Sequence, residues 1–142
     1  MITFRKFVES DWFEIDDPVN KYYDKINDVI KEFFSLLGNG VNFTMVENDK
    51  VICCGGVVYI DDNNAEAWIR LSTRASNKPL KLLKTIKVGF DMILRSLGSV
   101  NVSSHVLDGF NAGERLTEYL GFNKTEEFMI IGDKKYNKYA KI

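Results

Sequence analysis

The segment from Ala65 to Leu107 constrains the fold more than any other part of the chain. AEAWIRLS has the composition of a strand, and NVSSHVL follows as a second strand after a long helical pattern. Pro79 suits a first helical turn and Gly98 a helix end. A strand–helix–strand unit in one sheet is almost always right-handed, so we expect these two strands to be parallel. The apolar stripe of the helix consists of Leu80, Leu83, Ile86, Phe90, Ile93, Leu94 and Leu97.

The other elements predict a mixed sheet. A chain of 142 residues fits one domain, and no repeat or linker divides it, so we expect a single domain over 1–142. Ser10 or Asp11 is the expected N-cap of a helix that begins near Trp12. Two further helices are expected over 22–37 and 112–120, and further strands over 2–7, 42–60 (a hairpin), 126–132 and 134–142. The order β-α-α-β-β-β-α-β-α-β-β predicts an α/β (α+β) fold with helices on both faces of the sheet.

Composition excludes several classes of function. The formal net charge of -1 argues against a nucleic-acid or anionic-membrane partner for the whole protein. No run is long and apolar enough to span a bilayer, and the N-terminus has no apolar signal region, so we expect a cytoplasmic protein. Cys53 and Cys54 are adjacent and point to opposite faces of a strand. A disulfide or a zinc site is therefore not expected, and no metal is predicted.

Three stretches carry a resemblance to a known family. ITFRKFVESDWFEI looks like an opening strand with an acidic helix start. FTMVENDKVICCGGVVYI resembles a hairpin whose second strand contains glycine, and NAGERLTEYLGF a helix that ends in a Leu-Gly-Phe turn. Together with the element order, they resemble the GNAT superfamily of N-acetyltransferases over essentially the whole chain. The resemblance implies central parallel strands that splay apart, acetyl-CoA as cofactor, and transfer to a primary amine of a small molecule or protein.

The resemblance also implies a cofactor site. Pantetheine would pair with the backbone of Ile69, Arg70, Leu71 and Ser72, and the pyrophosphate would lie at the start of the helix near Pro79. The preceding loop lacks the family's glycines; side chains that could compensate are Arg74, Ser76, Asn77 and Lys78. Alternatively, Ser76 or Asn77 only caps the helix. Asn111 approximately matches a cofactor-side asparagine. Arg70 must reach solvent, a carboxylate or a ligand, because burying an unpaired guanidinium is costly.

The catalytic candidates are His105, Thr117 and Tyr119. His105, the single histidine, lies in the strand that the resemblance places beside the cofactor, where it is either a general base or a structural residue. The family's thiolate-protonating tyrosine precedes the Gly of Leu-Gly-Phe by four residues, and that position is Thr117 here. Tyr119 lies two residues later, about 200° around a helix. Glu66 is either a base that acts through water or a surface charge.

Two other functions fit the sequence. The glycine-free loop suggests a GNAT-like domain without catalysis, a binding or structural module similar to those of tailed bacteriophages, which would then be virion-associated. Such a module would act in a homo-oligomer or larger assembly. Nucleic-acid binding through the lysines of the long helix and the C-terminal segment fits the charge balance least well.

Overall fold

The computed structural model describes residues 2–15, 34–72 and 79–141. Within these residues, seven strands form one sheet in the order β1-β2-β3-β4-β5-β7-β6. β4 and β5 are parallel, as predicted, and all other neighbouring pairs are antiparallel. The strands are β1 (Ile2–Lys6), β2 (Gly40–Glu47), β3 (Lys50–Tyr59), β4 (Asn64–Leu71), β5 (Asn101–Leu107), β6 (Phe122–Ile131) and β7 (Lys134–Lys141).

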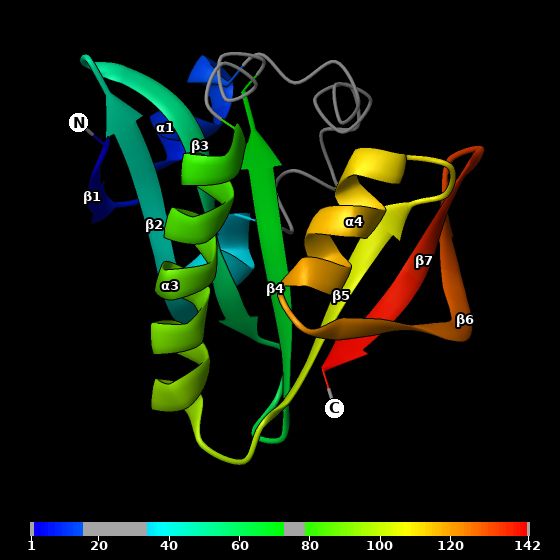
Figure 1. Cartoon of the computed structure of the whole chain (residues 1–142). Helices are drawn as coiled ribbons and strands as arrows, with labels where there is room; N and C mark the ends of the chain where they lie inside the picture. The colour runs from blue at the N-terminus through cyan, green and yellow to red at the C-terminus, as the bar shows by residue number, and fades with distance from the viewer. Residues whose placement is uncertain (1, 16–33, 73–78, 142) are drawn as a thin grey trace.

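Helices cover both faces of this mixed sheet, which confirms the predicted fold class. α3 (Pro79–Leu97) and α4 (Asn111–Tyr119) lie on the face toward the viewer in Figure 1, and α1 (Glu9–Glu14) lies behind the sheet. The helix expected over 22–37 falls mostly outside the described residues, and only its last turn, at 34–37, is described as helical. No helix in the described ranges is long and apolar enough to cross a membrane.

The buried side chains form one cluster on each face of the sheet. On the α3 and α4 face, the cluster contains Leu82, Ile86 and Phe90 of α3, Leu116 of α4, and Leu120, which follows α4. On the α1 face, the cluster contains Phe7, Trp12, Ile15, Leu37, Val51, Cys54, Val58 and Trp68. The expected α3 stripe needs one correction. Leu80 is 74% exposed, because the buried face of the helix begins at Leu82 instead.

The start of α1 also differs from the prediction. The helix begins at Glu9 with Val8 as its N-cap residue, so Ser10 and Asp11 lie inside its first turn. The Asp11 carboxylate, almost fully buried, accepts hydrogen bonds from Arg5, Thr44 and the Val8 N–H. Burial alone would raise the pKa of Asp11, but these donors outweigh it and hold the pKa below its ordinary value. Asp11 therefore ties α1 to β1 and β2.

Candidate active site

The candidate site lies where β4 and β5 separate. The two strands pair over three rungs, Asn64 with Asn101, Ala65 with Val102 and Glu66 with Ser103. Beyond Glu66, β4 continues beside β3, and β5 continues beside β7. Figure 1 shows the two strands diverging toward their C-terminal ends, with α3 and α4 on the same face. The splayed parallel strands that the resemblance implies are therefore present.

Main-chain hydrogen bonds show which residues of β4 face this opening. The Ser72 N–H donates to the Ile52 carbonyl of β3 (2.9 Å), and the Asn101 N–H of β5 donates to the Asn63 carbonyl (2.9 Å). Main-chain N–H and C=O groups alternate in direction along a strand. Those of even-numbered β4 residues therefore point toward β3, and those of odd-numbered residues point toward the β5 side. The main-chain groups that face the opening are those of Ala67, Ile69 and Leu71.

These groups fit the pantetheine arm of acetyl-CoA, whose amides need donors and acceptors in a row. Two of the four residues expected to contact it, Ile69 and Leu71, turn main-chain groups toward the opening. The other two, Arg70 and Ser72, direct theirs to β3, and their side chains are buried. The guanidinium carbon of Arg70 lies 4.1 Å from the centre of the Trp12 ring, so this residue helps hold α1 over β4.

A histidine–carboxylate pair lies at the base of the opening. The distance between His105 Nδ1 and Glu66 Oε2 is 2.8 Å, and both side chains are about three-quarters buried. Glu66 belongs to the last rung that β4 and β5 share, and His105 follows two residues after its partner Ser103. Glu66 lies on the same face of β4 as Trp68, which packs under α1. The pair thus lies on the face opposite α3 and α4.

Further charged groups continue from this pair across the same face of the sheet. Lys138 of β7 is directly opposite His105, and residues directly opposite in a sheet share a face. The Lys138 ammonium lies 3.4 Å from Glu127 of β6. Glu66, His105, Lys138 and Glu127 therefore form a polar row across four strands. This row places charged groups of both signs on one face of the sheet.

Thr117 of α4 is the residue at which the resemblance leads one to expect a tyrosine. The residue is buried, and its hydroxyl donates a hydrogen bond to the Gly113 carbonyl (2.7 Å), one turn earlier in the helix. A threonine hydroxyl is a very weak acid, and this one already has an acceptor. Thr117 is therefore poorly suited to protonate a thiolate.

Tyr119 projects from α4 in a different direction from Thr117, as the helical spacing predicts. It is 43% exposed, and the Lys87 ammonium of α3 lies 5.7 Å from its ring centre. α4 ends after Tyr119 in the Leu-Gly-Phe turn. Gly121 has φ +99°, which glycine adopts without strain, and Phe122 returns to the core. This turn caps the helix and fixes its end against the sheet.

The remaining predicted cofactor residues are divided between described and undescribed parts of the chain. Asn111 is the first residue of α4 and is exposed. The expected pyrophosphate side chains Arg74, Ser76, Asn77 and Lys78 lie outside the described residues. α3 itself begins at Pro79, as expected. Across 2–15, 34–72 and 79–141, no cluster of three or more residues suited to hold a metal ion occurs.

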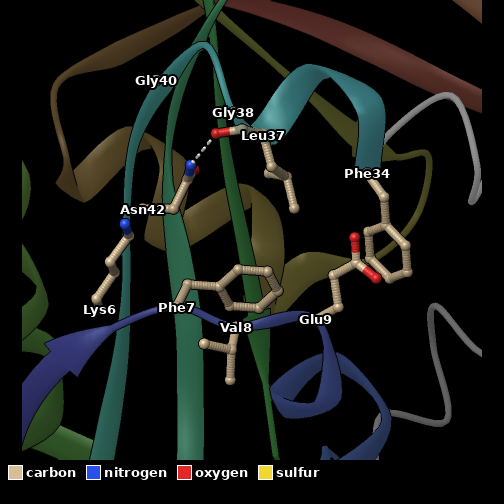
Figure 2. A pocket seen from close by; sticks show the side chains of 9 residues that line it. All are labelled: Lys6, Phe7, Val8, Glu9, Phe34, Leu37, Gly38, Gly40 and Asn42. Atoms are coloured by element: carbon tan, nitrogen blue, oxygen red, sulfur yellow. Dashed lines mark hydrogen bonds between the residues drawn. The ribbon is translucent and has the colours of Figure 1, made fainter.

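A separate hollow of about 450 Å³ lies near the end of β1 and the start of β2. Figure 2 shows Phe7 and Leu37 pointing into it, with Lys6 and Glu9 at two sides. Its Asn42 donates to the Leu37 carbonyl (2.8 Å) and accepts from the Trp68 Nε1–H (2.8 Å). Neither Glu66 nor His105 lines this hollow, so it is distinct from their pair.

Solved structures resemble the chain over nearly its whole length. An acetyltransferase from Streptococcus agalactiae superposes with a TM-score of 0.73 at 14% identity, covering 99% of this chain and 98% of that one. The ribosomal-protein-S18-alanine N-acetyltransferase from Escherichia coli gives 0.64 at 19% identity, with 99% and 93% covered. A spermidine N-acetyltransferase from Vibrio cholerae, in complex with CoA and spermine, gives 0.65 at 17% identity, with 98% and 94% covered.

At such low identities these likenesses show the fold, which is that of the GNAT acetyltransferases. A further similar structure, a GNAT family acetyltransferase from Elizabethkingia anophelis, has acetyl-CoA bound; its TM-score is 0.61 at 13% identity, with 99% and 97% of the chains covered. No family model and no curated protein matches the sequence.

Proposed function

We propose that this chain is an N-acetyltransferase that uses acetyl-CoA and a primary amine. The observation that carries the proposal is the separation of β4 from β5 beyond Glu66, with a histidine–carboxylate pair at its base. Acetyl-CoA supplies an activated acetyl group when bound. The main-chain groups of Ile69 and Leu71 hold its pantetheine arm, and the free N–H groups at the start of α3 favour its phosphates.

In this proposal His105 takes a proton from the amine. Imidazole accepts protons near neutral pH and is the most common side chain in this role. The pair lies on the face away from α3 and α4, so the amine approaches from the α1 face. Spermine in the Vibrio cholerae structure supports an amine as the class of acceptor.

A second candidate is a GNAT-like binding or structural module without catalysis. The hydrogen bond from Thr117 to Gly113, in place of a tyrosine phenol, favours it. Such a module would release no CoA with any amine, and it would join a homo-oligomer or larger assembly without needing acetyl-CoA. A bacteriophage or virion origin belongs to this second candidate.

Calorimetry and a thiol-release assay test the two candidates. We expect acetyl-CoA to bind and to raise the melting temperature, and CoA to be released with at least one member of a panel of polyamines, amino acids and peptide N-termini. A ligand at 100 times its Kd adds about 2.7 kcal/mol of stability. Binding without turnover, together with elution as an assembly in size exclusion, would favour the module. No binding at millimolar acetyl-CoA would exclude the acetyltransferase, and together with elution as an assembly it would also favour the module.

A further inference from the structure

We propose that Glu66 fixes the tautomer of His105, so that Nε2 of this one imidazole both takes the proton from the amine and returns it to the leaving thiolate. This inference rests on the proposed function and assigns a positioning residue to it. Glu66 touches neither reactant in this scheme; it acts through the imidazole.

The first step of the argument is the hydrogen bond itself. Glu66 Oε2 and His105 Nδ1 lie 2.8 Å apart. An ionised carboxylate can only accept, so the proton in this bond belongs to Nδ1. The neutral imidazole then has its lone pair at Nε2, which is the nitrogen that can take a further proton. A neighbouring carboxylate also stabilises the imidazolium that forms.

The second step concerns the return of the proton. Thr117, at the position of the family's acid, bonds to its own helix, and Tyr119 projects toward Lys87 of α3. Neither side chain is placed as a separate acid. The reaction still balances with one carrier: the amine nitrogen bonds to the acetyl carbon, the carbon–sulfur bond breaks, and the proton passes from nitrogen through Nε2 to sulfur.

A test of Glu66 needs a control for the loss of one negative charge, because other charged groups lie on the same face of the sheet as His105. On the same face they are Glu66 and Arg70 of β4, Lys138 of β7, and Glu127 of β6, which pairs with Lys138. Glu127→Gln is a matched control for Glu66→Gln, because it removes the same charge from the same row without touching the imidazole.

The single histidine makes a direct test possible, since a ¹⁵N-histidine-labelled chain gives one pair of ring nitrogens. We expect the neutral form in the wild type and in Glu127→Gln to carry its proton on Nδ1. In Glu66→Gln we expect a mixture of the two neutral tautomers, because the amide can both donate and accept. A wild-type ring protonated on Nε2, or a ring unchanged in Glu66→Gln, overturns the inference.

Kinetics give the second readout. His105→Gln should lower kcat about 100-fold or more while acetyl-CoA still raises the melting temperature. Glu66→Gln should lower kcat about 10-fold or more. A tenfold or greater fall of kcat in Tyr119→Phe would overturn the single-carrier scheme. Failure of the wild type to bind acetyl-CoA and to turn over would overturn the proposed function and the proton transfer, whereas the NMR result tests Glu66 separately.

Discussion

The Thr117 hydroxyl donates its hydrogen to the Gly113 carbonyl, 2.7 Å away, and so faces its own helix. If that bond is its whole role, Thr117→Ala should leave kcat within twofold of the wild type. The free energy of unfolding should change by no more than about 1 kcal/mol, because this type of back-bonding stabilises a helix little. Steady-state kinetics and urea unfolding check both. A large loss of kcat at unchanged stability would show that Thr117 orders a catalytic water.

Tyr119 gives the complementary prediction. Its ring, not its phenol, contacts the Lys87 ammonium at 5.7 Å, so Tyr119→Phe should keep both stability and turnover. Tyr119→Ala removes the ring and should lower the melting temperature slightly. Thermal unfolding and CoA release measure the two effects. A tenfold or greater fall of kcat in Tyr119→Phe alone would identify the phenol as the acid.

Gly56 of β3 leaves space for the hydrogen bond between Asn42 of β2 and Trp68 of β4. A Cβ at this position would contact the Val41 carbonyl oxygen and lie 2.5 Å from Asn42 Oδ1, the acceptor of the Trp68 Nε1–H. Its φ of +158° also disfavours other residues. Gly56→Ala should therefore destabilise the fold by about 3 kcal/mol. Gly38→Ala is the control, because nothing lies within 4 Å of its added methyl group. Equal denaturation midpoints for both variants would contradict this account.

The sequence predicted most of the fold because its signals are local. The stripe of α3 between two strands was enough for a parallel β4–β5 pair, and Gly121 was enough for the end of α4. The Glu66–His105 contact was missed, since the two residues are 39 positions apart and were considered separately. Alignment of the strand starts, Asn64 and Asn101, would have placed Glu66 beside Ser103 and so near His105.

Other features could not be predicted because they depend on tertiary packing. The pairing register between β3 and β4 decides which β4 residues turn main-chain groups toward the opening. No local sequence pattern gives that register. Likewise, an N-cap role for Asp11 was a reasonable reading of the local pattern, but Arg5 and Thr44 come from strands whose position relative to α1 no local pattern gives.

Asp11 provides the prediction on pH. Its pKa is held below the ordinary value, so its contribution to stability is fully present above about pH 4, the pKa of an unfolded aspartate, and is lost as the pH falls through the folded value. Asp11→Asn should lower the free energy of unfolding by about 2 kcal/mol at pH 7, mostly through loss of the hydrogen bonds from Thr44 and Val8. The Arg5 side chain contributes less, because it is 45% exposed and water screens its charge. The difference between variant and wild type should shrink below pH 4, whereas the exposed Glu9→Gln should match the wild type throughout. Urea unfolding between pH 3 and 7 measures the difference in free energy of unfolding between Asp11→Asn and the wild type. A difference that is constant with pH would show that Asp11 stabilises the fold by packing and not by its charge.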